Sequence, residues 1–163
     1  MLFRSPALDY ALYLRGIVNF NDDLGFLGSL TGQDLSERDQ AAARESYQSF
    51  KQLSEQFPDS KYTADARIRM DFTVNMLSEY EVHVASYYMR RQAYVAAANR
   101  AKESVLEFPQ TASTPEALSI MVAAYDKLGL NLLRDDAQRV LDKNFPPSAY
   151  AESNKNKAWW KFW

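Results

Sequence analysis

The feature that most constrains this chain is an uninterrupted stretch between two Phe-Pro pairs. From Phe57-Pro58 to Phe108-Pro109 the sequence contains neither Gly nor a further Pro. Its first part has apolar or aromatic side chains at a four-residue step, at Ala64, Ile68, Phe72, Met76, Tyr80, Val84 and Tyr88. Side chains at that step form one slanting ridge on a helix. The pattern predicts a helix over 62–91, far longer than the roughly three turns of an average globular helix, and buried along its ridge by more than one neighbour.

Composition excludes several classes of function. The 163 residues carry 19 basic and 21 acidic side chains, well mixed, which gives no electrostatic reason to expect nucleic acid as a ligand. The absence of Cys removes disulfides, thiolate catalysis and Cys-ligated metals. We interpret the only His, His83, as a partly buried structural side chain, and Glu79 and Glu81 as solvated groups on different helix faces. The sequence therefore predicts no enzyme and no catalytic, cofactor-binding or metal-binding residues.

Helical patterns continue on both sides of the long stretch, and strand-type alternation is absent, so the chain is predicted to be all-α. Each predicted helix has an apolar face and a recognisable start or stop. The first opens at Pro6 and buries Ala7, Tyr10, Ala11, Leu14 and Val18. The second buries Ala43, Tyr47, Phe50, Leu53 and Phe57. Asp59 and Ser60 cap the long helix. Beyond it, a second amphipathic pattern with a different phase predicts a helix that buries Tyr94, Ala98, Ala101, Val105 and Phe108. Thr114 then caps a helix through Leu118, Met121, Val122 and Tyr125, Gly129 stops it, and a last helix buries Leu133, Ala137, Val140 and Leu141.

Residues 21–35 interrupt this helical pattern with Gly and apolar side chains. Phe26 and Leu27 lie at the apolar tip of the predicted loop. Apolar loops that remain exposed mark contact sites, which makes both residues candidates for binding a partner. The alternative is that they fold back as a lid on the core.

A repeat is indicated by three Phe-Pro pairs that close helices. The prolines at 58 and 109 are 51 positions apart, and those at 109 and 146 are 37 apart, against a period of about 34 residues for tetratricopeptide repeats. Ala85, Tyr88 and Ala97 then occupy the small and aromatic sites of one repeat, and Tyr125 and Gly129 those of the next. We predict a tetratricopeptide-like α-solenoid of antiparallel helix pairs with one extra-long helix. Its parts are a helix pair over 1–58 with the inserted loop 21–35, a repeat with an extended first helix over 59–109, a last repeat over 110–147 and a tail over 148–163.

Three long motifs carry a family resemblance. LDYALYLRG at 8–16, AAARESYQSFKQLSEQFPDSKYTADARIRM at 41–70 and YYMRRQAYVAAANRAKESVLEFP at 87–109 resemble the BamD family, also called YfiO or ComL. These are tetratricopeptide lipoproteins of the bacterial machinery that assembles outer-membrane β-barrel proteins. The resemblance covers residues 8–146 and corresponds to the third to fifth repeats. We therefore expect this chain to be a C-terminal portion without the family's signal peptide, lipidated Cys and first two repeats. Its contact with the membrane is then expected to be indirect, through the lipid anchor that the family carries at its N-terminus.

The resemblance implies that the chain is a docking scaffold of the β-barrel assembly (BAM) complex, at the periplasmic face of the outer membrane. It implies contacts with the last POTRA domain of the barrel-forming subunit BamA and with small lipoproteins of the complex. Arg100 lies in the shared motif, and Arg is a favoured interface anchor, although pairing within the repeat is the rival role. Arg90 and Arg91 end the long helix and are candidates for the same partner contact, because a turn could bring Arg91 and Arg100 to the same end of the repeat. Compensation of the helix dipole is the alternative, and it would explain Arg90 and Arg91 without a partner.

Other interpretations stay open from the sequence. A generic repeat module with a short peptide in its concave groove is one, and the regulatory domain of an enzyme is another.

The tail holds all three Trp, at 159, 160 and 163, among Lys155, Lys157 and Lys161. That composition suits the bilayer interface, whereas a disordered or back-folded tail is the alternative. A terminal repeat without its neighbour exposes apolar surface, so self-association is also expected.

Overall fold

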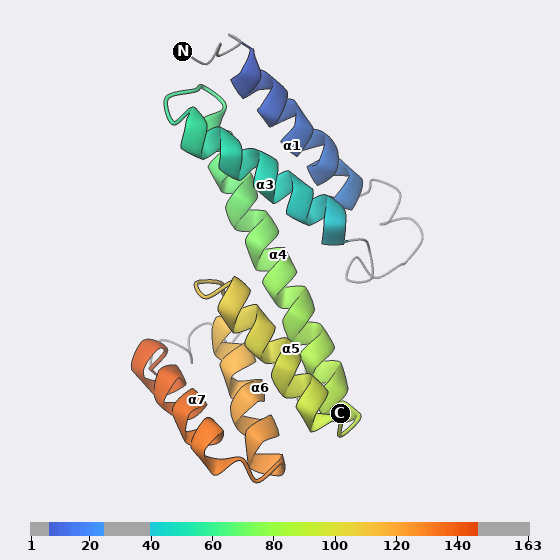
Figure 1. The fold of residues 1–163 in the computed structure, drawn as a ribbon, viewed down its shortest axis with the longest axis vertical. Helices are drawn as coiled ribbons and strands as arrows, with labels where there is room; N and C mark the ends of the chain where they lie inside the picture. The colour runs from blue at the N-terminus through green and yellow to red at the C-terminus, as the bar shows by residue number, and fades with distance from the viewer. Residues whose placement is uncertain (1–6, 25–39, 147–163) are drawn as a thin grey trace. The chain divides into compact units, whose positions relative to one another are not determined.

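The computed structural model describes residues 7–24 and 40–146 of the chain, and these residues form six helices (Figure 1). In chain order the helices are α1 (Leu8–Leu24), α3 (Gln40–Gln56), α4 (Thr63–Arg90), α5 (Tyr94–Glu107), α6 (Thr114–Lys127) and α7 (Asn131–Asn144). No strand occurs among the described residues. The all-α class is confirmed, and the successive packing of neighbouring helices is that of a tetratricopeptide-like solenoid with one helix, α4, of 28 residues.

The chain divides into two compact units, residues 1–77 and 78–163. The boundary falls inside α4, so the first part of this helix belongs to one unit and its last part to the other. In the first unit α1 packs against α3. Its core contains Leu12, Phe50, Leu53 and Ala66, and half-buried side chains surround these four: Tyr13, Ile17, Phe20, Phe57, Tyr62 and Met70.

A close approach between α1 and α3 depends on Gly16. A Cβ atom at this position would lie 2.4–2.7 Å from three ring carbons of Phe50, well inside van der Waals contact. The carbonyl of Gly16 also accepts a 2.9 Å hydrogen bond from the buried hydroxyl of Ser46. Gly16 therefore lets the Phe50 ring lie directly against the backbone of α1.

The predicted buried face of α1 is wrong. Tyr10, Leu14 and Val18 are exposed, with 45%, 41% and 58% of their surface accessible, and Ala7 and Ala11 are exposed as well. The face that meets the core instead carries Leu12, Tyr13, Gly16, Ile17 and Phe20. Because α1 is apolar around most of its girth, its periodicity could not select a face, and the fit of Gly16 to Phe50 selects the other one.

The predicted ridge of α4 is also wrong in its first half, since Ala64, Ile68 and Phe72 are exposed. Successive side chains on a 3.6-residue helix that are four positions apart advance by about 40°, so a ridge at that step winds away from a straight contact. The side chains that α4 buries are mostly small or hydroxylic. They are Thr63, Ala66, Thr73 and Leu77 in the first unit, and Ser78, Glu81, Val82 and Ala85 in the second.

In the second unit α5 packs on α6, and α6 packs on α7. The small residues predicted between helices are fully buried here: Ala85 and Ala97 join one cluster with Val82, Ala101, Ala117 and Ile120. A second cluster contains Ala98, Ala124, Tyr125 and Ala137. Small side chains let helices approach closely, which confirms the small sites predicted at Ala85 and Ala97.

The predicted turns of the second unit lie close to their expected places. Gln92 follows α4 with a φ of 60°, and Gly129 follows α6 with a φ of 70°. The N-cap of α6 is Ser113, one residue before the predicted Thr114, and Pro115 lies in the first turn. On α7, Leu133 and Val140 are exposed although they were predicted to be buried, and Ala137 alone is fully buried. As the last helix of the described solenoid, α7 is covered from one side only.

A buried chain of hydroxyl groups links α4, α5 and the start of α6. The hydroxyl of Ser78 is hydrogen-bonded to Ser104 at 3.0 Å and to Thr111 at 2.7 Å. The Thr111 hydroxyl lies 3.1 Å from that of Thr114, and each of the two hydroxyls can donate its one proton to the carbonyl of Phe108 at 3.2 Å and 3.1 Å respectively. Every one of these polar groups is satisfied without water, which allows them to be buried at little cost. The sequence patterns did not predict this network.

Candidate protein-docking surface

The three predicted basic residues lie at two separate places in the second unit, Arg90 and Arg91 at one and Arg100 at the other. Arg90 ends α4 and Arg91 follows it, both exposed, before the turn at Gln92. The Arg91 guanidinium lies over the ring of Tyr87, 5.5 Å from its centroid, and its Nε donates to the Tyr87 hydroxyl at 3.2 Å. Tyr87 is itself exposed. An Arg stacked on an exposed Tyr is an arrangement found at protein interfaces.

Arg100 lies on α5, next to Glu81 of α4. Its Nη1 donates to Oε2 of Glu81 at 3.2 Å. Arg90 lies nine positions after Glu81 on α4, a rise of roughly 14 Å at 1.5 Å per residue. The turn between α4 and α5 therefore does not bring Arg100 and Arg91 together into one cluster, and the surface has two separate basic points.

Glu81 is buried, with 4% of its surface accessible, and this differs from the solvated position predicted for it. Glu79 is exposed, so the two carboxylates do point to different faces as predicted. A signal for the burial of Glu81 exists in the sequence. Glu81 precedes Ala85 by one helical turn, and Ala85 was already placed at the close contact between helices.

The guanidinium of Arg100 has a second carboxylate nearby. Oε2 of Glu103, one turn later on α5, lies 3.5 Å from Arg100 Nη1. The charge of Glu81, followed by its hydrogen bond, raises the pKa of Arg100 above its ordinary value, and Glu103 adds to the rise. The pairing within the repeat, which is the alternative role predicted for Arg100, is thus present. Its side chain nevertheless remains 44% exposed, so the guanidinium is available at the surface.

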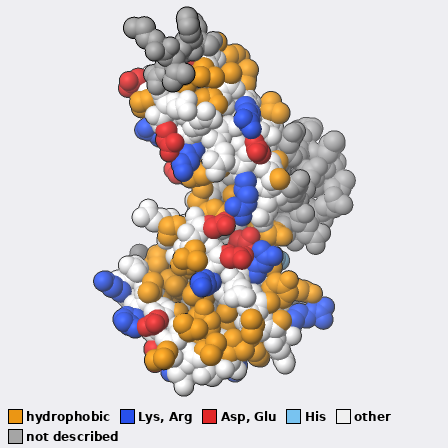
Figure 2. Space-filling model, viewed as in Figure 1, with side chains coloured by type: hydrophobic (Ala, Val, Ile, Leu, Met, Phe, Trp, Pro, Cys, Tyr) orange, Lys and Arg blue, Asp and Glu red, His pale blue; other side chains and the backbone are white. Residues whose placement is uncertain are grey.

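Apolar side chains accompany these charges on the surface of the second unit. Figure 2 shows hydrophobic side chains gathered where α5 and α6 lie, with basic and acidic groups around them. The large apolar residues exposed in this unit are Tyr87, Val95, Leu106, Leu130, Leu132, Leu133 and Val140. Exposed apolar area next to Arg and Tyr is typical of protein-binding surfaces.

Several predicted features fall elsewhere. Phe26 and Leu27, like the tail from 148 to 163, lie outside the described residues. His83 is exposed rather than partly buried. Residues 7–24 and 40–146 contain no group of three or more side chains that could hold a metal ion, and none of their helices is long and apolar enough to span a bilayer.

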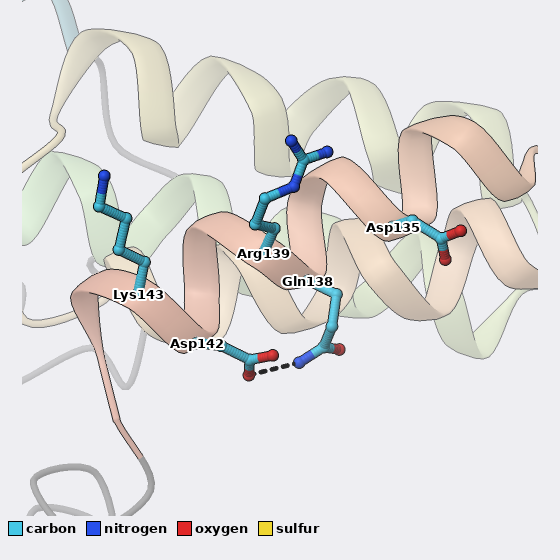
Figure 3. A pocket seen from close by; sticks show the side chains of 5 residues that line it. All are labelled: Asp135, Gln138, Arg139, Asp142 and Lys143. Atoms are coloured by element: carbon cyan, nitrogen blue, oxygen red, sulfur yellow. Dashed lines mark hydrogen bonds between the residues drawn. The ribbon is translucent and has the colours of Figure 1, made fainter.

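The hollow shown in Figure 3 is formed by α7 alone. It is lined by Asp135, Gln138, Arg139, Asp142 and Lys143, and Gln138 Nε2 donates to Asp142 Oδ1 at 2.7 Å. Small-molecule sites are concave and bury most of the ligand surface, whereas this hollow is open and is formed by four charged side chains and one amide of a single helix. It does not have the character of a ligand site.

Consecutive helix pairs with small residues between them, and charged and apolar side chains on their outer faces, define a helical-repeat protein of the tetratricopeptide type. Its sequence shows to which family of such repeat proteins it belongs. A model of the YfiO family, described as an outer membrane lipoprotein, matches residues 3–141. The chain belongs to this family, as the resemblance predicted.

Individual relatives agree with that placement, and each bears the name outer membrane protein assembly factor BamD. The protein of Neisseria meningitidis serogroup A (strain Z2491) is 48% identical over 161 residues, which cover 97% of this chain and 60% of the relative. That of Xylella fastidiosa (strain 9a5c) is 41% identical over 85% of this chain and 48% of its own length. That of Haemophilus influenzae is 35% identical over 86% and 54%. The chain thus spans about half to three fifths of these relatives, and neither their name nor the family description denotes an enzyme.

Proposed function

We propose that this chain is a non-enzymatic docking scaffold in outer-membrane protein assembly. Its partners are the POTRA region of the barrel-forming subunit BamA and the small lipoproteins of the same complex, at the periplasmic face of the outer membrane. Membrane attachment is indirect, through the lipid anchor that the family description implies. Support comes from the family placement and from the names of the relatives.

The observation that carries the proposal is the anchored but accessible guanidinium of Arg100. The buried carboxylate of Glu81 fixes one of its nitrogens, while 44% of the side chain stays exposed. A fixed guanidinium loses little conformational freedom on binding and presents several N–H donors in one plane. Such a group is suited to a carboxylate on the partner.

Arg90, Arg91, Phe26 and Leu27 complete the proposed contacts. The Arg91–Tyr87 stack offers a second, separate contact point near the end of α4. Two contact points on one rigid helix pair restrict how a partner can be oriented. Phe26 and Leu27 are proposed as an apolar contact on the grounds of their sequence alone.

Replacing Arg100 by Glu tests the proposal. We expect the affinity for a soluble POTRA region of BamA, measured by isothermal titration calorimetry, to fall by at least tenfold, because an attractive contact becomes repulsive. Arg139→Glu is the matched control, since it makes the same charge change on the exposed face of α7. Circular dichroism verifies that both variants fold. Unchanged affinity in the folded Arg100→Glu variant would contradict the role of Arg100.

The exposed face of α1 supports self-association of this chain through a second copy. Leu14 and Val18 present apolar side chains to solvent, and Ala7 and Ala11 on the same face are small enough for a second helix to approach closely. Leu12 and Ile17 on the opposite face are already occupied by the core. Packing of α1 against α1 of a second copy would remove this apolar surface from water.

A further inference from the structure

We infer that Glu81 and Glu103 act in opposite ways on partner binding at Arg100: Glu81 positions the guanidinium, and Glu103 competes with the partner's carboxylate for it. The inference rests on the proposed function and identifies the chemistry at that site. It follows from the different burial and attachment of the two carboxylates, which both approach the same nitrogen, Nη1.

Glu81 cannot leave its place without cost. Only 5% of its side chain is accessible, and its neighbours Val82 and Ala85 belong to the apolar cluster between α4 and α5. A carboxylate that loses its partner in such a place is left charged in poorly solvated surroundings, which is strongly unfavourable. The Glu81–Arg100 contact is therefore retained when a partner binds, and it sets the direction of the guanidinium.

Glu103 is held much less firmly. Its side chain is 58% exposed, and it approaches Arg100 at 3.5 Å from three residues along the same helix. This contact is an ion pair between partly exposed groups, a class that contributes little because water and salt screen it. Glu103 can rotate into solvent and leave a guanidinium N–H for another acceptor.

The local charge gives Glu103 a second effect. One guanidinium faces two carboxylates, so the three groups together carry a net charge of −1. A partner carboxylate that approaches Arg100 is repelled by the exposed Glu103 while it is attracted by the guanidinium. Glu103 thus weakens binding in two ways: it occupies an N–H donor of Arg100, and it repels the carboxylate of the partner. It therefore also discriminates against partner carboxylates that cannot reach Arg100 closely.

Replacing Glu103 by Gln separates this account from a simple surface role. We expect Glu103→Gln to bind the soluble POTRA region of BamA about 1.5- to 5-fold more tightly at low salt, a range that corresponds to the energy of one exposed ion pair. The gain should shrink as salt is added. Glu79→Gln is the matched control, because it removes the same charge from an exposed position of α4 in the same unit. Equal or weaker binding by Glu103→Gln, or an equal gain in the control, would overturn the competition.

The positioning role of Glu81 is tested through Arg100. Glu81→Gln should weaken binding about tenfold in the native background and have no further effect when Arg100 is already Ala. A merely structural role for Glu81 would weaken binding equally in both backgrounds, and that result would overturn the assignment. Arg100→Ala also separates this inference from the function proposed above. If Arg100→Ala binds as well as the native chain, the docking role of Arg100 fails; if it binds weakly and Glu103→Gln shows no gain, only the competition fails.

Discussion

The hydroxyl of Tyr13 on α1 donates a 2.8 Å hydrogen bond to Oδ2 of Asp65, 52 positions later on α4. The same oxygen accepts a 2.6 Å hydrogen bond from Nε of Arg69, and the Arg69 guanidinium lies over the ring of Phe20, 5.0 Å from its centroid. One carboxylate oxygen therefore ties two helices of the first unit together. The hydrogen bond to Asp65 raises the pKa of Tyr13 above its ordinary value.

This arrangement predicts a loss of stability in acid. The hydrogen bond from Arg69, and after it the one from Tyr13, lowers the pKa of Asp65 below its ordinary value of 3.8. A carboxyl whose pKa is lower in the folded state stabilises the fold above the unfolded pKa, and the contribution disappears as the pH falls through the folded value. Because Asp65 is 44% exposed, we expect Asp65→Asn to cost only about 0.2–1 kcal/mol at neutral pH. Urea unfolding at neutral pH should show a lower free energy of unfolding for Asp65→Asn than for the native chain. Below the pKa of Asp65 in the folded state, the two free energies should become equal. A difference that persists in acid would contradict the assignment.

Gly16 predicts a steric effect. Gly16→Ala places a methyl group 2.4 Å from the Phe50 ring, and overpacking of this kind costs about 1–3 kcal/mol, against a gain of up to about 1 kcal/mol in helix propensity. We expect a net loss of stability in urea unfolding. In the smaller Phe50→Leu background the same substitution should cost less or become favourable. Equal costs in both backgrounds would show that the ring is not what Gly16 accommodates.

The sequence predicted helix breaks and small contact sites well, because both have local chemical causes. The change of phase after Arg91 corresponds to the turn at Gln92, and the small residues Ala85 and Ala97 lie where two helices touch. The choice of buried face on α1 and α4 has no such local cause. It depends on which neighbour offers a fitting surface, as Phe50 does to Gly16.

Arg100 and Glu81 illustrate the same limit at the candidate site. The motif around Arg100 was recognisable, but its pairing with a buried acid 19 positions earlier depends on how α5 crosses α4. Pattern rules treat Glu as a solvated residue because it is rarely buried without a partner. Only the fold shows that Arg100 supplies that partner.

The buried hydroxyl network predicts a large effect for a small change. Ser78→Ala removes the group that bonds both Ser104 and Thr111, so two buried hydroxyls each lose a partner. We expect a cost of about 1–3 kcal/mol in urea unfolding. The control is Ser119→Ala, whose half-buried hydroxyl bonds only the carbonyl of Pro115 within its own helix. A cost for Ser78→Ala no greater than that of the control would show that the network contributes nothing.

The exposed face of α1 predicts concentration-dependent dimers of this chain. Sedimentation equilibrium should show dimers of the native chain, and Val18→Glu should weaken them, because a charge would be buried in the apolar contact. Each 1.4 kcal/mol lost raises the dissociation constant about tenfold, and burial of a Val or Leu side chain contributes roughly that much or more. Leu132→Glu is the matched control, since Leu132 on α7 is 84% exposed, more than any other large apolar residue that the structure describes, and it should leave dimerisation unchanged. A native chain that stays monomeric at all concentrations, or a control that weakens dimers as much as Val18→Glu, would rule out α1 as the contact.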